Sequence, residues 1–174
     1  PTAQRAPDTR RLHALIVGID RYRHSDAHQP GAALSDLRGA AGDALRFKQA
    51  LAELYGVDVD APARDACDSS NAATTTLTDG CATRARILQA LEQRIATLHA
   101  GDTLLFYFAG HGSRYRDDGA RDQDTGYNGT ILPTDARNPD GSPGDIFDVE
   151  LKALKDRATA KGLFFVSVFD SCNS

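Results

Sequence analysis

Three short apolar runs constrain this chain more than any other feature of its sequence. They cover Leu12–Ile19, Thr103–Phe108 and Leu163–Phe169. All three are rich in β-branched or aromatic residues, and none alternates regularly between apolar and polar positions. Runs of this length and kind are typical of β-strands that are covered on both faces, as in a parallel sheet. The sequence therefore predicts a buried sheet whose strands lie far apart in the chain.

The segments between these runs carry the spacing of amphipathic helices. We expect helices at about residues 39–55, 83–99 and 148–160, with Gly56 ending the first helix and Thr83 capping the second. The apolar residues that recur three or four positions apart are Phe47, Leu51 and Leu54 in the first helix, Leu88, Leu91, Ile95 and Leu98 in the second, and Leu151, Leu154 and Ala158 in the third. One face of each helix is therefore predicted to pack on the sheet.

A further strand is expected between the first two helices. Its candidates are residues 57–59 and the β-branched patch at 74–77, which could also complete a hairpin. The resulting alternation of strands and helices predicts an α/β sandwich with a largely parallel sheet and right-handed crossovers.

The remaining segments are polar and are predicted to form loops. Residues 1–11 have no apolar pattern and should form a flexible arm. Residues 20–38 should form a long surface loop. Residues 114–145 are rich in Asp, Gly, Asn and Pro, and only residues 130–132 look ordered there. A loop of this length is usually functional or mobile.

Two of the apolar runs end in residues with catalytic chemistry. The run at 103–108 is followed by His111 and Gly112, and the run at 163–169 is followed by Asp170 and Cys172. In open α/β sheets the binding crevice lies at the carboxyl ends of the strands, so these residues are expected to meet there. A thiol attacks a carbonyl carbon well only as thiolate or beside a base. His111 can be that base and can later protonate the leaving amine.

Gly112 has a separate predicted role. Because it lacks a Cβ, its backbone N–H can approach the oxyanion that forms during attack, with the N–H of Cys172 as the second donor. The sequence thus predicts a nucleophile, a base and an oxyanion hole from two loops.

Each catalytic candidate also has a simpler interpretation. Cys172 could be an inert thiol at a strand end, and His111 could be an ordinary loop histidine. The joint pattern of two apolar runs, one ending in Gly-His-Gly and the other in Asp-Ser-Cys, favours catalysis. The other histidines are interpreted as structural or solvated: His13, His24, His28 and His99.

These motifs resemble those of the caspase-like cysteine peptidases, specifically the metacaspase and orthocaspase branch. Residues 107–113 (YFAGHGS) resemble the family's histidine motif, and residues 170–174 (DSCNS) resemble its cysteine motif. Residues 15–22 resemble its first strand, and residues 37–44 resemble its Leu-x-Gly-Cys-x-Asn-Asp-Ala motif. The resemblance covers roughly residues 12–174.

The resemblance implies a three-layer caspase-like sandwich with a mostly parallel central sheet flanked by helices. Residues 12–174 would form the p20-like catalytic domain, following the flexible arm at 1–11. The family fold continues past the cysteine, so its last strands are missing from this chain. We therefore expect a C-terminal p10-like segment or chain to complete the domain, since Leu163–Phe169 would otherwise be an exposed apolar edge strand.

By the resemblance, Cys172 is the nucleophile and His111 the general base and acid of a cysteine endopeptidase acting on protein or peptide substrates. The positions that match the acidic S1 pocket of the family are Asp43 and Asp170. Two carboxylates beside a catalytic thiol favour a cationic side chain, because an acidic one would meet like charge. We therefore expect cleavage after Arg or Lys. Ala109 stands where the family usually has Ser, which leaves the choice between Arg and Lys open.

Three other interpretations stay open. Asp43 could be only a first-turn carboxylate that the helix macrodipole favours. The enzyme could share this layout of His and Cys but prefer another residue before the scissile bond. The module could also be catalytically silent and serve signalling or assembly, although a silent module has no need to retain both His111 and Cys172.

Many metacaspases require calcium, held by acidic residues after the histidine and before the third helix. In this chain the candidate calcium ligands are Asp122, Asp124 and Asp148, because Ca²⁺ takes hard oxygen ligands such as carboxylates. The alternative is a solvated acidic loop, since the family's paired Asp-Asp before the helix is replaced here by Asp148-Val149-Glu150. No organic cofactor is expected.

Charge and hydropathy argue against other classes of protein. The chain has 20 Lys and Arg against 24 Asp and Glu, a net charge of −4, and no basic stripe interleaved with aromatic residues. This pattern argues against nucleic-acid binding. No stretch approaches the roughly 18 apolar residues of a transmembrane helix.

The expected compartment depends on the cysteines. Cys67 and Cys81 lie in polar sequence and could pair in an exported protein, leaving Cys172 free. We favour the cytoplasm, where Cys67 and Cys81 would be two free thiols. The chain begins at Pro1 and contains no Met, so it is interpreted as a processed product, and export with loss of a signal peptide stays open.

Overall fold

The computed structural model describes residues 11–26, 28, 33–56, 67–68, 73–116, 127–140 and 144–172. Their elements, in chain order, are β1 (Leu12–Gly18), α1 (Ala40–Tyr55), β2 (Cys67–Asp68), β3 (Thr74–Thr78), the 3₁₀ turn η1 (Asp79–Cys81), α2 (Arg84–Thr97), β4 (Thr103–Ala109), β5 (Gly112–Arg116), β6 (Tyr127–Ile131), β7 (Ile146–Phe147), α3 (Asp148–Ala160) and β8 (Phe164–Asp170). The candidate strand at 57–59 and residues 1–10 of the expected arm lie outside the described residues.

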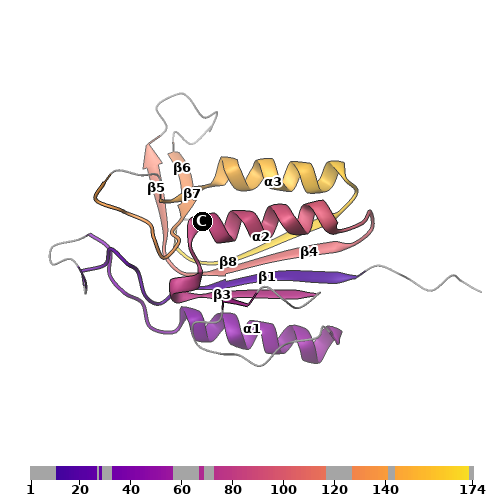
Figure 1. Ribbon diagram of the computed structural model, residues 1–174, viewed down its shortest axis with the longest axis horizontal. Coiled ribbons are helices and arrows are strands. Elements are labelled where there is room, and N and C mark those ends of the chain that lie inside the picture. Colours follow the sequence, from indigo (N-terminus) through magenta and orange to yellow (C-terminus); the bar gives the residue numbers. More distant parts are fainter. Residues whose placement is uncertain are drawn as a thin grey trace, which may run out of the picture.

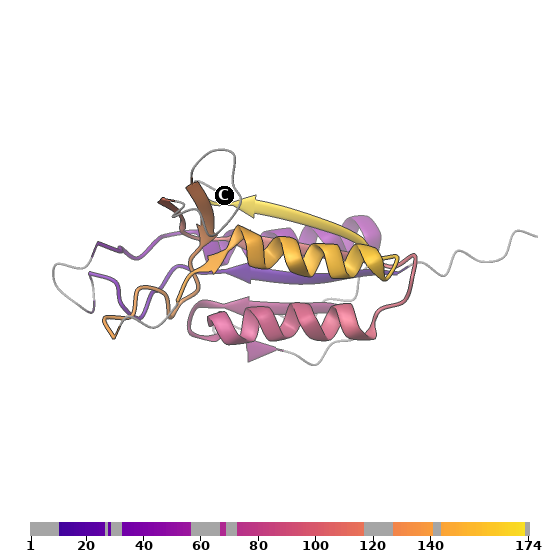
Figure 2. The same cartoon turned by 90° about the horizontal axis from the view of Figure 1, so that it is seen from above.

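The central sheet has the strand order β2-β3-β1-β4-β8. Strands β3, β1, β4 and β8 run parallel, and the short strand β2 pairs antiparallel with β3. Figure 1 shows α1 on one face of this sheet and α2 and α3 on the other, and Figure 2 shows β8 along one edge. The predicted three-layer α/β sandwich with a mostly parallel sheet is therefore confirmed.

The continuous apolar runs are explained by the two covered faces of the sheet. Successive strand residues point to opposite faces, so each strand contributes to two separate cores. On the side of α2 and α3, the core includes Leu15, Val17, Leu104, Phe106, Ile87 and Leu91. On the side of α1, it includes Ala14, Ile16, Leu105, Tyr107, Ala44 and Leu51.

The predicted caps Gly56 and Thr83 are correct, but the second helix ends at Thr97 rather than at about residue 99, and one predicted helix face is wrong. Gly56 ends α1 with a left-handed φ of 62°, and the Thr83 hydroxyl accepts a hydrogen bond from the N–H of Arg86 (3.3 Å) at the start of α2. Leu54, however, is 75% exposed, so its predicted burial is wrong. The inward face of α1 is set by Ala44 and residues four and seven positions later, which leaves Leu54 outside.

Residues 114–145 contain more structure than the sequence predicted. Strands β5, β6 and β7 form a separate antiparallel sheet in that order. The prediction that only residues 130–132 are ordered is therefore wrong. These strands carry polar residues such as Ser113, Arg114 and Asn128, so they lack the apolar signature of the central strands.

Residues 20–38 were predicted to form a surface loop, and this prediction is wrong for several of them. Tyr22 and Ser25 are fully buried, and Leu34 is nearly so. The segment is tied to the body of the protein by backbone bonds, such as the N–H of Arg23 to the carbonyl of Thr134 (2.8 Å). Its described residues are therefore part of the fold and can position catalytic groups.

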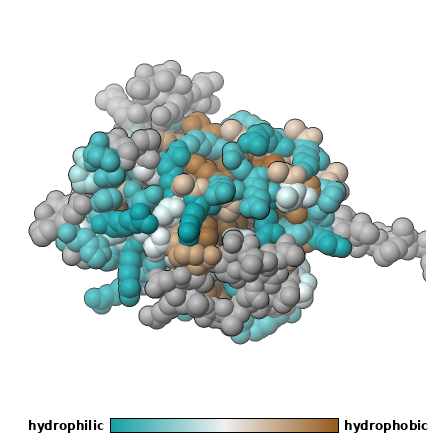
Figure 3. Space-filling model, in the orientation of Figure 1, coloured by the Kyte–Doolittle hydropathy of each residue, from teal (hydrophilic) through white to brown (hydrophobic). Residues whose placement is uncertain are grey.

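Cys67 and Cys81 form a disulfide that joins β2 to η1, so the preference for two free thiols is wrong. Cys172 is free and exposed. Within the described parts of the chain, no helix is both long and apolar enough to cross a membrane. On the face seen in Figure 3, hydrophilic side chains prevail and hydrophobic ones show only in small areas between them.

Candidate active site

Two neighbouring strands end in the residues that the sequence singled out. β4 and β8 are paired with Ala109 opposite Asp170, and His111 and Cys172 each follow that pair by two residues. The N–H of Gly110 donates to the carbonyl of Asp170 (3.3 Å), which ties the two strand ends together. The topology therefore brings the predicted base and nucleophile to the same edge of the sheet.

Gly112 lies against the turn that carries Cys172. A Cβ placed on Gly112 would lie 1.8 Å from the carbonyl oxygen of Cys172 and 3.3 Å from the hydroxyl oxygen of Ser171. The φ of Gly112 is not in the left-handed region, so glycine is required here for space alone. The backbones of the histidine loop and the cysteine loop are thus in direct contact.

The N–H of Gly112 is not used by the β5–β6 ladder. Gly112 pairs with Ile131, and the N–H of the next residue, Leu132, donates to the carbonyl of His111 (2.9 Å). In an antiparallel ladder, a hydrogen bond between the residues that flank a pair identifies that pair as non-hydrogen-bonded. The N–H groups of the pair itself then point away from the partner strand. The N–H of Gly112 therefore points away from β6, as an oxyanion donor would need.

The imidazole of His111 is anchored by one ring nitrogen. Its Nε2 lies 2.8 Å from the carbonyl oxygen of Ser35. A carbonyl can only accept a hydrogen bond, so Nε2 carries the proton in the neutral ring and Nδ1 keeps a lone pair. This arrangement leaves Nδ1 as the basic atom, and it explains why residues 33–38 matter to the site.

Tyr22 holds the backbone of the same loop, and sequence reasoning missed it. Its hydroxyl accepts a hydrogen bond from the N–H of His111 (2.8 Å), and the two rings lie 5.1 Å apart. Burial raises the pKa of the Tyr22 phenol, so the hydroxyl stays protonated. The available signal was an aromatic residue close after a buried strand, in a segment that otherwise looks like polar loop.

The two predicted S1 carboxylates converge on the Tyr107 hydroxyl. Tyr107 donates to Oδ2 of Asp170 (3.4 Å). Burial, together with the negative charges of Asp170 and Asp43, raises the pKa of Tyr107 to about 12. Asp43 lies in the first turn of α1, as its simpler interpretation also predicts, and forms an exposed ion pair with Arg46. The sequence did not indicate that pair.

Only one of the three predicted calcium ligands can be placed. Asp148 begins α3, where its Oδ2 accepts from the N–H of Gly129 (3.1 Å) and its Oδ1 from the N–H of Val149 (2.7 Å). Asp122 and Asp124 lie outside the described residues.

The acidic neighbours of Asp148 are paired with arginines. Asp145 pairs with Arg137 (3.1 Å), and Glu150 pairs with Arg84. Across the described ranges, no group of three or more His, Cys, Asp or Glu residues is arranged to hold a metal ion. The described residues therefore do not form a calcium site by themselves.

Comparison with known proteins gives one consistent family. Residues 12–174 match the family described as metacaspase, peptidase C14 domain. Metacaspase-1B of Aspergillus oryzae is 32% identical over 167 residues, which cover 95% of this chain and 35% of that protein. Metacaspase-1 of Plasmodium falciparum is 32% identical over 166 residues, which cover 92% of this chain and 23% of that protein.

A solved structure shares the fold. Protein GSU0716 from Geobacter sulfurreducens has a TM-score of 0.64 and 25% sequence identity, covering 93% of this chain and 50% of that one. The chain thus spans 35% and 23% of the length of the two metacaspases, and half of the solved protein. Because the family match runs over nearly its whole length, the chain belongs to the metacaspase family of peptidase C14 domains.

Proposed function

We propose that this chain carries the catalytic dyad of a cysteine endopeptidase that cleaves after Arg or Lys. The observation that carries the proposal is the contact between the two loops. Gly112 has room for no side chain against Cys172, and its N–H faces away from β6. A silent assembly module needs neither this close contact nor a histidine anchored through Nε2.

The geometry suggests a sequence of steps. Nδ1 of His111 takes the thiol proton, and Sγ of Cys172 attacks the carbonyl carbon of the scissile bond. The oxyanion that results is stabilised by the N–H groups of Gly112 and Cys172. The C–N bond then breaks as His111 returns the proton to the leaving amine, and water hydrolyses the thioester to restore the free thiol.

The preference for a basic residue is supported by the S1 carboxylates. The negative charges of Asp43 and Asp170 both raise the pKa of Tyr107, so both carboxylates are near enough to act on the same hydroxyl. The Tyr107 hydroxyl leaves the charge of Asp170 uncompensated. A cationic side chain could therefore pair with Asp170 and, in place of Arg46, with Asp43. A different preference before the scissile bond is the alternative within the enzyme class.

Active-site labelling tests the dyad. A peptide chloromethylketone with Arg at its reactive end should label the full-length wild-type protein and not Cys172→Ala, and His111→Ala should be labelled far more slowly. Each reaction is run with and without calcium. Labelling of Cys172→Ala, or no labelling of the wild type under either condition, would contradict the proposal and favour the silent module.

Substrate profiling tests the S1 pocket. Asp170→Asn and Asp43→Asn should each lower turnover of Arg and Lys substrates relative to neutral ones. Asp156→Asn, an exposed carboxylate paired with Lys152 on α3, is the matched control. Unchanged selectivity in both pocket variants would favour a different specificity.

We further propose that a p10-like segment or chain completes the sheet beside β8. In the described residues β8 pairs only with β4, and its Phe164 and Val166 side chains are 57% and 43% exposed. An apolar edge strand of this kind is a template for a further strand. Co-expression with the segment that follows in the full-length gene should protect the β8 amides from hydrogen exchange; unchanged exchange would argue against that pairing.

Calcium and location remain two separate proposals. Calcium binding by Asp122, Asp124 and Asp148 is tested by calorimetric titration of the wild type against Asp148→Asn.

The cytoplasmic location stays a prediction, and the Cys67–Cys81 disulfide weighs against it because such bonds are rare in a reducing cytosol. Thiol labelling in intact cells decides this point: two protected cysteines contradict a cytoplasmic location.

A further inference from the structure

A cavity lies beside His111, and neither Asp43 nor Asp170 lines it. Its volume is about 520 Å³, within the usual range for ligand sites. Its described lining consists of His24, Ala33, Leu34, Ser35, His111, Gly112, Ser113, Leu132 and Arg137. These residues come from the segments after β1, β4 and β6, and none of them comes from β8.

The strand order relates this cavity to the scissile bond. β4, which leads to His111, lies between β1 and β8. Cys172 follows β8, whereas His24 and Ser35 follow β1, so the cavity begins at His111 and Gly112 and extends from them toward the residues that follow β1. Since His111 would protonate the leaving amine, the part of the substrate after the scissile bond must lie on its side, toward the cavity.

The charge of the described lining favours an anion. Its charged group is the guanidinium of Arg137, and no carboxylate lines it among the described residues. Asp145, which pairs with Arg137, is 5% exposed and does not line the cavity. Arg137 is 35% exposed and can therefore be reached by a ligand.

Arg137 is held in a fixed orientation. One of its amino groups, Nη2, donates to the hydroxyl of Ser113 (2.9 Å) and pairs with Asp145 (3.1 Å). Its guanidinium also lies over the ring of Tyr115, 4.9 Å from the centroid. Both of these contacts use Nη2. Among the described residues, the other guanidinium N–H groups are therefore available to a ligand. The Ser113 hydroxyl accepts from Arg137 and keeps its own proton to donate.

We propose that this cavity binds an acidic side chain at the first or second position after the scissile bond, with Arg137 and Ser113 as the residues that recognise it. A carboxylate there would receive a planar guanidinium and a hydroxyl, which is a strong, charge-assisted combination. The inference rests on the proposed peptidase activity, because that activity defines the leaving-group side.

Internally quenched peptides test the proposal. Each has Arg before the scissile bond and carries either Glu or its neutral isostere Gln at the first or second position after it. In wild-type full-length protein, kcat/KM should be about tenfold higher for Glu than for Gln at one of these positions. This ratio should fall below about twofold in Arg137→Gln, fall partly in Ser113→Ala, and remain in Arg114→Gln. Arg114 is exposed, lies over Tyr127, and does not line the cavity.

The outcomes separate this proposal from the proposed function. An Arg–dye amide has no residue after the scissile bond, so its cleavage reports on the dyad and the S1 pocket alone. If it is cleaved but Glu and Gln peptides react equally, or if the preference survives Arg137→Gln, the acidic subsite is wrong. If no substrate is cleaved, the proposed function is wrong, and peptide affinity for Cys172→Ala decides the subsite. Equal affinity for Glu and Gln peptides then overturns it, and a Glu preference abolished by Arg137→Gln supports it.

Discussion

The two ends of the central sheet use polar residues in opposite ways. At the amino ends of the strands, the buried carboxylate of Asp102 accepts the N–H groups of Arg11 (3.1 Å) and His99 (2.9 Å). At the carboxyl ends, His111 is fixed by Ser35 and Tyr22. The first arrangement joins chain segments to each other, whereas the second holds the proposed catalytic imidazole in place and leaves its other ring nitrogen without a bond to Ser35 or Tyr22.

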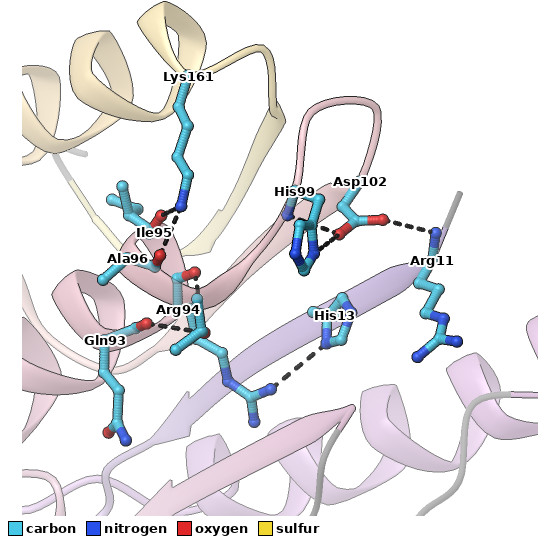
Figure 4. A network of polar contacts seen from close by, with 10 residues as sticks. Arg11, His13, Gln93, Arg94, Ile95, Ala96, His99, Asp102 and Lys161 are labelled. Carbon is cyan, nitrogen blue, oxygen red and sulfur yellow. Dashed lines mark hydrogen bonds and ion pairs between the residues drawn. The ribbon is translucent and has the colours of Figure 1, made fainter. Parts of the chain in front are cut away.

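Figure 4 shows further polar contacts that join chain segments at the amino ends of the strands. Arg94 of α2 reaches Nδ1 of His13 in β1 (3.4 Å) and the hydroxyl of Thr75 in β3 (2.7 Å). Lys161, which follows α3, donates to the carbonyl of Ile95 (2.8 Å) near the end of α2. Changes at the amino ends should therefore reduce stability, and changes at the carboxyl ends should reduce turnover.

Gly112→Ala should have the largest effect and should reduce turnover. The new Cβ would overlap the carbonyl of Cys172, a backbone atom that can move only with the whole cysteine turn. The shift would displace the nucleophile and one oxyanion donor together, so kcat/KM on an Arg–dye amide should fall by about 10²–10³-fold. Steady-state kinetics and a thermal melt on the same sample provide the measurement.

Gly80→Ala is the matched control for this change. A Cβ on Gly80 would meet no atom within 4 Å, and its φ is not left-handed. It should keep wild-type turnover. Near-normal kinetics in Gly112→Ala would mean that the two loops do not need their close contact.

Removal of the disulfide should show that the effect on turnover is confined to the ends of β4 and β8, because the bond lies beyond the carboxyl end of β3 and should act mainly on stability. Cys67 and Cys81 are 14 residues apart, so their cross-link should contribute about 3 kcal/mol by restricting the unfolded chain. The double variant Cys67→Ser, Cys81→Ser should lose that free energy of unfolding in urea titrations. Dithiothreitol should destabilise the wild type by a similar amount and leave the double variant unchanged; equal sensitivity of both proteins would show that the bond contributes nothing.

The sequence predicted the central sheet because buried parallel strands leave an unmistakable apolar run, as at Thr103–Phe108. It also predicted that His111 and Cys172 would lie at the same edge of the sheet, because the carboxyl ends of parallel strands share one edge. It did not predict Tyr22 or Ser35. Ser35 acts through its backbone carbonyl, which leaves no trace in residue identity, and Tyr22 is buried by contacts with segments distant in the chain.

Asp102→Asn should act on stability at the amino ends. Burial alone raises the pKa of Asp102, but the N–H groups of His99 and Arg11 and nearby imidazoles outweigh it, so the pKa lies below its ordinary value. A lowered pKa stabilises the fold above the unfolded value, near 3.9, and this contribution is lost as the pH falls through the folded pKa. The variant should unfold about 1–2 kcal/mol more easily at pH 7, and the difference should shrink below about pH 4.

Urea titrations at several pH values test this expectation, with Asp156→Asn as the control. Asp156 forms an exposed pair with Lys152 (2.7 Å), and such a pair should contribute less than about 1 kcal/mol. Turnover per folded molecule should remain normal in both variants. A pH-independent loss in Asp102→Asn would show that the lost packing, rather than the carboxylate charge, causes the effect.

Tyr22→Phe should have the smallest effect, but it examines the carboxyl end most selectively. The variant keeps the buried ring and removes only the oxygen that accepts the N–H of His111. One neutral hydrogen bond contributes about 0.5–1.5 kcal/mol, so kcat should fall about three- to tenfold while KM stays constant. Tyr55→Phe, whose ring is 67% exposed at the end of α1, should change neither parameter.

If Tyr22 only filled space, kcat would be unaffected. If it acted as the base itself, the ascending limb of the pH–rate profile would move, whereas positioning of His111 predicts a lower plateau with both limbs in place.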